Sequence, residues 1–201
     1  MGPTVLGVRH GEVHNPRGII YAGLPGYGLS QTGREQAREV GEALKGAPVA
    51  AVYASPLDRA VETAGIVASA VGADVIVDDR LHEWRHWHQF AGLTWEQLRT
   101  EASEAWNAYL SDPGSVTSGE SLAALADRVE SWLDEAIRSH SSGLVVGVTH
   151  LEPLRAVLLR RLGRPARDLF SLEIGLGRAV RLAPETDATP LSADGLLRAA
   201  L

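Results

Sequence analysis

The 201-residue chain contains no cysteine. Disulfide bonds, thiolate catalysis and cysteine-ligated metal sites are therefore excluded. Positive charge is outweighed by negative charge, because the net charge is −6 at pH 7, and this argues against binding to nucleic acid. The sequence lacks an apolar run near the roughly 20 residues that span a bilayer, and we expect no signal peptide, since charged residues begin at Arg9. We therefore expect a cytoplasmic protein without nucleic-acid or membrane partners.

The remaining composition is that of a globular domain, with 45% hydrophobic and 22% charged residues. Its length favours one domain over residues 1–201, with a peripheral tail at 184–201. Short apolar runs predict strands at 4–8, 49–53, 74–77 and 144–149. Segments with helical spacing lie between them. Strands that alternate with helices predict an α/β fold, a three-layer α/β/α sandwich with a mostly parallel central sheet.

Local signals predict where the helices begin. The predicted starts are the T-x-x-E capping box at Thr32, the N-cap Ser55 with Pro56 behind it, and the capping box at Thr94. The last of these opens a helix over 94–109. Segments 170–175 and 178–183 predict a terminal strand pair.

A histidine directly follows the first predicted strand, in Arg9-His10-Gly11. Residues just past the C-terminal ends of such strands lie at the crevice where ligands bind. An imidazole can act as nucleophile, acid or base near neutral pH. A guanidinium binds phosphate or carboxylate with two hydrogen bonds, and a glycine lets backbone N–H groups approach an anion. These residue types together predict an oxyanion site, with the Gly- and Pro-rich segment 9–31 as one wall.

Two more basic side chains are expected at the same rim. The predicted strand 144–149 also ends on a histidine, His150, and both imidazoles line one crevice if the two strands are neighbours. Arg59 lies near the start of a predicted helix and would share this crevice. The site would then surround a compact dianion, with one imidazole attacking phosphorus while Arg9 and Arg59 hold the equatorial oxygens.

The leaving alkoxide needs a proton, so an acid is expected on the opposite side of the phosphate. Glu83 lies in an aromatic stretch with Trp84, Trp87 and Phe90. Partial desolvation there, together with the charge of the phosphate, would raise the pKa of Glu83 towards a useful value. We therefore predict that Glu83 is the general acid.

Five motifs of the sequence occur in the order typical of one enzyme superfamily. They are Arg9-His10-Gly11-Glu12, Ser55-x-x-x-Arg59-Ala60-x-x-Thr63-Ala64, Leu81-x-Glu83, Gly119-Glu120-Ser121 and Val148-Thr149-His150. Over about residues 4–182 the chain resembles the histidine phosphatase superfamily, which is the phosphoglycerate-mutase-like clan. The resemblance implies a three-layer α/β/α fold and a phosphohistidine intermediate on His10.

The same resemblance implies roles for the other site residues. Arg9, Arg59 and His150 form the phosphate pocket, and Glu83 acts as proton donor and then as the base for water. It implies neither a metal nor another cofactor, and a homodimer is compatible with the family.

Three positions depart from the family pattern. Val13 replaces a Thr or Ser, Pro16 replaces an Asn, and Leu151 replaces a Gly. Asn15 lies one residue before Pro16 and is a candidate for the missing asparagine in the phosphate site. These departures leave the identity of the substrate open.

The sequence thus predicts a metal-independent phosphoric monoester hydrolase that acts on a small-molecule phosphate ester, sugar-like or glycolytic. The predicted substrate-side contacts are Tyr21, Trp84, His86 and Trp87. Packing in the core is an equally good interpretation of the two tryptophans.

Three alternatives remain open. A phosphoglycerate mutase would share the fold, but the chain is short and lacks the long insertion expected to exclude water, which favours hydrolysis. A zinc hydrolase would use the H-E-x-x-H pattern of His82-Glu83-x-x-His86, which requires a helix and a third ligand; Glu104 is a distant candidate, and Gln89 stands where an extended motif needs glycine. Binding of a phosphate ligand without catalysis would not need an acid.

Overall fold

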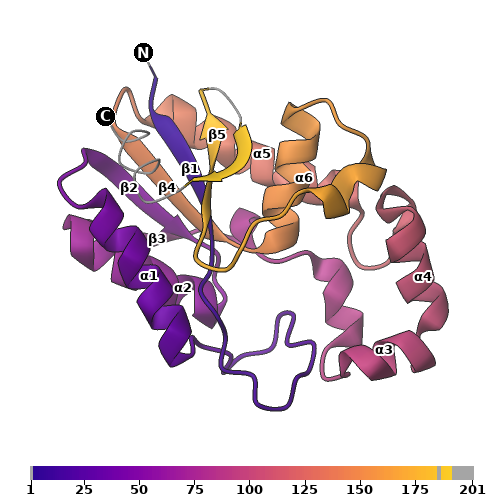
Figure 1. Cartoon of the computed structure of the whole chain (residues 1–201). Helices are drawn as coiled ribbons and strands as arrows, with labels where there is room; N and C mark the ends of the chain where they lie inside the picture. The colour runs from indigo at the N-terminus through magenta and orange to yellow at the C-terminus, as the bar shows by residue number, and fades with distance from the viewer. Residues whose placement is uncertain (1, 185–186, 192–201) are drawn as a thin grey trace.

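The computed structural model describes residues 2–184 and 187–191, and its centre is a six-stranded sheet (Figure 1). The strands lie in the order β3-β2-β4-β1-β5-β6. Their bounds are β1 Thr4–Arg9, β2 Val49–Ala54, β3 Val75–Val77, β4 Leu144–Thr149, β5 Ala179–Ala183 and β6 Asp187–Leu191. The strands β1 to β4 are parallel, whereas β5 and β6 run antiparallel to their neighbours.

Helices cover both faces of this sheet. Their bounds are α1 Gln31–Leu44, α2 Asp58–Val71, α3 Trp95–Glu101, α4 Ser103–Ser111, α5 Leu122–Ser139 and α6 Leu151–Arg161. Short 3₁₀ helices are η1 Asp79–Leu81, η2 Arg85–Phe90, η3 Pro113–Ser115 and η4 Ala166–Ser171. The helices α1 and α2 lie against one face, α5 and α6 against the other, and α3 and α4 extend to one side (Figure 1). The predicted three-layer α/β/α sandwich is confirmed.

Two glycines side by side let α5 and α6 approach the sheet closely. Gly7 of β1 pairs with Gly147 of β4. A Cβ atom on Gly7 would lie 2.4 Å from a methyl group of Leu154, and one on Gly147 would lie 2.3 Å from the ring of Trp132. Side chains from α6 and α5 therefore occupy the space that two Cβ atoms would need, and α6 begins directly at the strand ends.

The start of α1 differs from the predicted capping box. Ser30 is the N-cap, and its hydroxyl accepts a hydrogen bond from the amide of Gly33 and donates one of 2.6 Å to the carboxylate of Glu12. The prediction that Thr32 caps this helix is wrong, because the carboxylate partner selects the serine two residues earlier.

Of the predicted starts of α2 and α3, the first is wrong and the second is correct. The helix α2 begins at Asp58, so Ser55 is not its N-cap. The capping box at Thr94 is confirmed, since its hydroxyl accepts from the amide of Gln97 and the Gln97 side chain accepts from the amide of Thr94. The helix predicted over 94–109 is interrupted at Ala102, which separates α3 from α4.

The terminal strand pair lies further along the chain than predicted. Residues 166–171 form η4, and the antiparallel pair consists of β5 and β6. The edge strand β6 thus falls within the predicted peripheral tail, while 185–186 and 192–201 lie outside the described residues. Within the described part of the chain, every helix is too short or too polar to cross a bilayer.

Candidate active site

The two histidines that end predicted strands lie side by side. The strands β1 and β4 are direct parallel neighbours, with Arg9 opposite Thr149. The ring centroids of His10 and His150 are consequently 5.1 Å apart, at an interplanar angle of 62°. The adjacency that the sequence argument assumed is therefore present in the fold.

The ring of His10 has a defined tautomer and is neutral. Its Nδ1 lies 2.7 Å from the carbonyl oxygen of Gly11. Because a carbonyl only accepts, the proton is on Nδ1 and the lone pair is on Nε2. Burial, followed by the positive charge of Arg59, lowers the pKa of His10 to about 3. A neutral imidazole with a free Nε2 has the properties of a nucleophile.

Gly11 has a different role from the predicted one, in which its backbone N–H approaches an anion. Its N–H donates 3.1 Å to the hydroxyl of Thr63 rather than standing free for an anion. A Cβ atom at this position would lie 2.4 Å from the carbonyl oxygen of Gly33. Glycine is thus required because the loop behind His10 and the first turn of α1 are in backbone contact.

The second histidine, His150, is fully buried at the N-terminus of α6. Its Nε2 lies 2.8 Å from the hydroxyl of Ser55, and that oxygen accepts the amide N–H of Leu57. A serine proton donated to Nε2 would place the ring proton of His150 on Nδ1. That Nδ1 is 3.9 Å from Oε2 of Glu83. Burial, and next Arg59, hold the pKa of His150 well below 6.5, so this ring is also neutral.

Arg59 is buried and Arg9 is partly buried, and both retain hydrogen-bond donors without partners among the described residues. Arg9 donates 2.7 Å to the carbonyl of Ile174, and Arg59 donates 2.9 Å to the carbonyl of Ala22. The Nε of Arg9 and the Nε and Nη1 of Arg59 are buried and have no partner within the described residues. The Arg59 guanidinium also lies 4.7 Å from the ring centre of Tyr21. Buried cationic donors left unpaired fit an anion that they bind.

Ala22, which holds Arg59, has a strained backbone. Its φ of 37° lies in the left-handed region that alanine seldom adopts. Strained residues cluster where ligands bind, so the loop that carries Ala22 is a constrained part of the site.

Glu83 lies between η1 and η2 with a side chain that is only 13% exposed. Its Oε1 accepts a hydrogen bond of 2.7 Å from the amide of Trp84. Burial, followed by the negative charge of Glu152, raises the pKa of Glu83 to about 8. The carboxyl group therefore carries a proton at neutral pH and can donate it.

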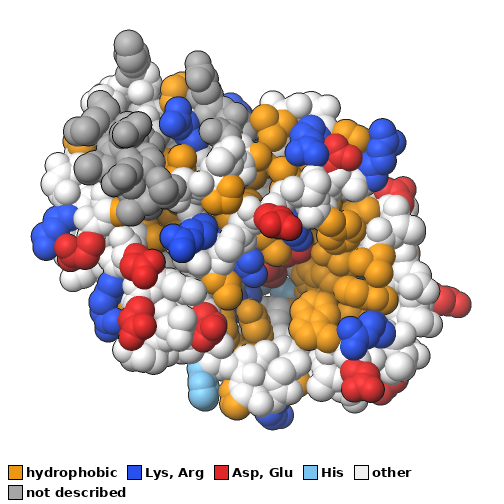
Figure 2. Space-filling model, viewed as in Figure 1, with side chains coloured by type: hydrophobic (Ala, Val, Ile, Leu, Met, Phe, Trp, Pro, Cys, Tyr) orange, Lys and Arg blue, Asp and Glu red, His pale blue; other side chains and the backbone are white. Residues whose placement is uncertain are grey.

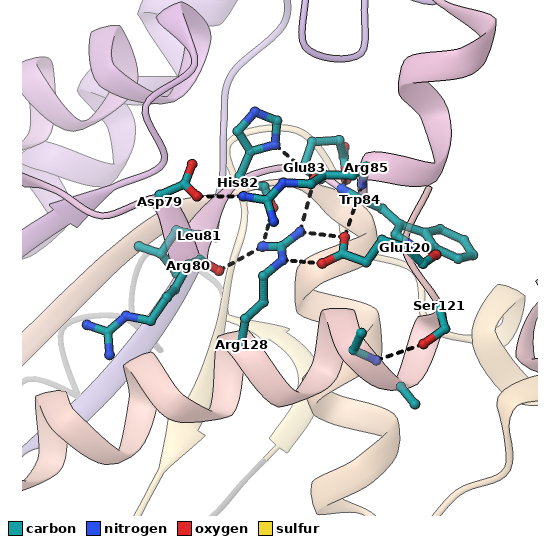
Figure 3. A network of polar contacts seen from close by, with 12 residues as sticks. Asp79, Arg80, Leu81, His82, Glu83, Trp84, Arg85, Glu120, Ser121 and Arg128 are labelled. Atoms are coloured by element: carbon teal, nitrogen blue, oxygen red, sulfur yellow. Dashed lines mark hydrogen bonds and ion pairs between the residues drawn. The ribbon is translucent and has the colours of Figure 1, made fainter. Parts of the chain in front are cut away.

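The loop that carries Glu83 is fixed from below by α5. Figure 3 shows Arg128 of α5 beneath the loop, in contact with Glu120 and with backbone carbonyls. Arg128 donates 3.0 Å to the carbonyl of Glu83, and the amide of Arg85 donates 3.1 Å to the carboxylate of Glu120. Glu83 thus belongs to a segment held at both flanks.

The side chains of Arg9, His10, Arg59 and Glu83 line one pocket of about 410 Å³, whereas His150 is fully buried and is not part of its lining. Figure 2 shows the hollow, with hydrophobic side chains gathered along one side. The predicted contacts Asn15, Tyr21 and Trp87 line it together with Arg9, His10, Arg59 and Glu83. The side chain of Asn15 donates 2.8 Å to the carbonyl of Ile19, so it also shapes the loop.

Two predicted substrate contacts do not reach the pocket. Trp84 is fully buried, and its indole N–H donates 2.8 Å to the carbonyl of Glu120. His86 is 2% exposed and packs between the rings of Trp84 and Phe90, with Nδ1 3.0 Å from the Ser118 hydroxyl. The structure places both rings in the interior, outside the lining of the pocket.

The helix required by the zinc alternative is also missing. Residues 82–84 are not helical, and η2 begins only at Arg85. The two histidines of the H-E-x-x-H pattern therefore do not share a helix face, and the Nδ1 atoms of His82 and His86 face the carbonyl of Glu83 and Ser118 respectively.

Sequence reasoning missed several groups around this site. Ser55 was interpreted as a helix cap although it contacts His150. Glu152 and Arg155 line the pocket, although the sequence analysis does not single them out. Their position on the pocket wall follows from where α6 starts, and the Leu-Glu-Pro that follows His150 was the available signal.

The comparisons agree with this geometry. The sequence matches the profile of the histidine phosphatase superfamily (branch 1) over residues 5–193. An uncharacterised protein of Mycobacterium tuberculosis is 34% identical over 168 residues, which cover 78% of this chain and 77% of that protein. Phosphoserine phosphatase 1 of Hydrogenobacter thermophilus is 35% identical over 159 residues, with 78% and 74% covered.

Among solved structures, a mycobacterial glucosyl-3-phosphoglycerate phosphatase has a TM-score of 0.77 at 26% identity, with 90% of each chain covered. The chain therefore belongs to the histidine phosphatase superfamily. It is a phosphoric monoester hydrolase or mutase, and the resemblance drawn from the five motifs is confirmed.

Proposed function

We propose that this protein is a metal-independent phosphomonoesterase that forms a phosphohistidine on Nε2 of His10. One observation carries the proposal: a neutral imidazole with a free lone pair lies beside two arginines that keep buried N–H donors without partners among the described residues. The arginines supply positive charge and N–H donors to the three equatorial phosphate oxygens, and Nδ1–H of His150 supplies a further donor. The chain's own groups thereby position the phosphate and stabilise its charge during transfer.

The first step transfers the phosphoryl group to the enzyme. The lone pair on Nε2 of His10 attacks phosphorus, a P–N bond forms, and the P–O bond to the leaving group breaks. Glu83 gives its proton to the departing oxygen, which leaves as an alcohol. The pKa of about 8 suits this acid role, because the carboxyl group is protonated before the reaction begins.

The second step releases phosphate. Glu83, now a carboxylate, removes a proton from water while the water oxygen attacks phosphorus. The P–N bond breaks, its electron pair returns to Nε2, and inorganic phosphate leaves. Both the proton and the nucleophile are restored, so one carboxyl group serves as acid and then as base.

Hydrolysis is favoured over a mutase reaction by the open mouth of the pocket. Trp95 and Leu110 line this pocket and are each 46% exposed, so water can reach the phosphorylated histidine. Two of the relatives are named as phosphatases, which supports the same choice.

The test is release of inorganic phosphate from p-nitrophenyl phosphate and from ethyl phosphate in the presence of EDTA. We expect wild-type turnover, and loss of turnover by at least about 10³-fold in His10→Ala, because no other group replaces the nucleophile. His14→Ala is the matched control, since this histidine is exposed in the same loop. Turnover that persists in His10→Ala would contradict the nucleophile. Isomerisation of a phosphoglycerate without phosphate release would show a mutase.

A further inference from the structure

We propose that Glu152 selects against anionic leaving groups, so that the substrates are phosphate esters of uncharged alcohols with an apolar or aromatic body. This inference rests on the proposed phosphatase activity and concerns the part of the pocket beyond the phosphate. Three features of that part carry it: a buried carboxylate, an arginine already paired, and a wall of aromatic rings.

The carboxylate of Glu152 lies two residues after His150, in the first turn of α6, and lines the pocket. The residue is only 7% exposed. Its Oε1 accepts 3.2 Å from the hydroxyl of Tyr109 and 3.3 Å from Nη1 of Arg155. These donors hold the carboxylate in place, so it forms a fixed negative wall for any leaving group.

The arginine beside it already contacts two protein groups. Among the described residues that line the pocket, Arg155 is the third arginine besides Arg9 and Arg59. Its Nε donates 2.8 Å to the carbonyl of Leu172, and its Nη1 faces Glu152. A carboxylate on the leaving group that approached Arg155 would lie next to the carboxylate of Glu152 in a partly desolvated space.

The charges of the pocket balance for a neutral leaving group. A bound phosphate dianion matches the two charges of Arg9 and Arg59. The charges of Glu152 and Arg155 match each other, and the protonated Glu83 adds none. An additional negative charge on the leaving group would therefore remain uncompensated.

The same part of the pocket is walled by large aromatic rings. The wall comes from η2, α3, α4 and η4 and consists of Trp87, Trp95, Trp106, Tyr109 and Phe170. Neighbouring rings support one another, with centroids 4.8 to 6.1 Å apart along the wall. This apolar surface, on one side of the hollow in Figure 2, favours a leaving group that buries rings or alkyl groups against it.

The preference differs from what two relatives' names suggest. Phosphoserine and glucosyl-3-phosphoglycerate, the compounds in those names, both carry a carboxylate, which only in phosphoserine is balanced by an ammonium group. We expect this protein to hydrolyse esters with an unbalanced carboxylate poorly although it shares the fold.

Four alkyl phosphates separate charge from size. The charge pair is 3-(phosphonooxy)propanoate and its methyl ester, and the size pair is ethyl phosphate and 2-phenylethyl phosphate. We expect kcat/KM to be at least about tenfold higher for the methyl ester than for the carboxylate, and at least about tenfold higher for the phenylethyl ester than for the ethyl ester. If the esters of a pair bind without being hydrolysed, we compare their inhibition constants for the hydrolysis of p-nitrophenyl phosphate.

Variants identify the residues responsible. Glu152→Gln keeps a hydrogen-bonding side chain but removes the charge, so the ratio between methyl ester and carboxylate should fall towards one. Because each comparison is a ratio of kcat/KM between two esters, a change in the acid Glu83 that affects both esters equally cancels. Trp106→Ala should reduce only the ratio of the size pair, and Glu96→Gln, an exposed carboxylate on α3, should leave both ratios unchanged. Turnover of ethyl phosphate shows that each variant is folded.

The outcomes distinguish the two proposals. A preference for the carboxylate ester, or a charge ratio that Glu152→Gln leaves unchanged, would overturn the inference while the phosphatase activity stands. Failure to hydrolyse any ester, including p-nitrophenyl phosphate, would overturn the proposed function itself.

Discussion

The guanidinium of Arg128 and the carboxylate of Glu120 form a bidentate ion pair, with Nε–Oε1 and Nη2–Oε2 distances of 2.6 and 3.0 Å. The remaining N–H groups of Arg128 donate to the backbone carbonyls of Arg80, His82 and Glu83 (Figure 3). The two side chains are only 12% and 7% exposed. All five donors of the arginine are thus used: three bind carbonyls of the loop that carries the predicted acid, and two bind Glu120, which itself accepts the amide N–H of Arg85 in that loop.

The first prediction is that Arg128→Lys removes hydrogen bonds that hold this loop against α5. A lysine ammonium lacks the planar fork and cannot reach five acceptors in these directions. Breaking such a buried pair costs about 3–5 kcal/mol when a partner is removed, so we expect a conservative replacement to lower the free energy of unfolding by somewhat less. Turnover of ethyl phosphate should fall more than that of p-nitrophenyl phosphate, because only the alkyl leaving group needs the acid.

Urea denaturation and the two turnover numbers measure these effects. Arg160→Lys is the control, because Arg160 pairs with carboxylates of α5 at the surface and is 35% exposed. Equal losses on both esters would show that Arg128 supports the fold without positioning Glu83.

The second prediction concerns pH. Since the pKa of Glu83 is raised to about 8, its acid form prevails below that pH and disappears above it. We expect kcat/KM for ethyl phosphate to decline about tenfold per pH unit above roughly 8, because the proton donor is lost. Hydrolysis of p-nitrophenyl phosphate should show a weaker decline.

Glu83→Gln provides the matched comparison. An amide cannot titrate, so the alkaline decline should vanish along with most turnover of ethyl phosphate. A decline that survives in Glu83→Gln would assign it to another group.

The parts of the site that sequence reasoning found share one property: they follow from periodicity near the residue itself. His10 and His150 end apolar runs, and parallel strands place such ends at one edge. The functions of Gly11 and Ser55 could not be read in this way. Each depends on a contact with a residue far along the chain, Gly33 in one case and His150 in the other, and no local spacing reports such contacts.

The aromatic residues illustrate the same limit. Trp84 lies next to the predicted acid in sequence, yet its ring points into the core and its N–H is satisfied there. Trp106 is distant in sequence, yet it lines the pocket because α3 and α4 fold back over the site. Proximity to Glu83 along the chain suggested a substrate contact for Trp84, whose ring lies in the interior, and gave no signal for Trp106.

A third prediction tests the tautomer of His150. Ser55→Ala removes the hydroxyl that faces Nε2 and leaves a buried nitrogen without its partner, which costs about 1–3 kcal/mol of stability. We expect the ring proton to redistribute between the two nitrogens, visible in the ¹⁵N chemical shifts of His150, together with a lower kcat. Ser111→Ala, at an exposed serine, should alter neither. Unchanged ¹⁵N shifts in Ser55→Ala would show that the serine does not set the tautomer.

The last prediction compares two glycines in helices. A Cβ atom on Gly33 would lie 2.0 Å from the carbonyl oxygen of Glu12, in the backbone that follows His10. Gly33→Ala should therefore displace that backbone, destabilise the protein by about 1–3 kcal/mol and lower kcat, because the nucleophile moves with it. Gly65 lies in the middle of α2, and a Cβ atom there meets no described atom within 4 Å.

Gly65→Ala should instead raise the free energy of unfolding by about 0.5–1 kcal/mol through helix propensity, with turnover unchanged. We expect urea denaturation to show a lower free energy of unfolding for Gly33→Ala and a higher one for Gly65→Ala. Only Gly33→Ala should lose kcat. If Gly33→Ala were as stable and active as the wild type, the contact between the nucleophile loop and α1 would not be what holds His10 in place.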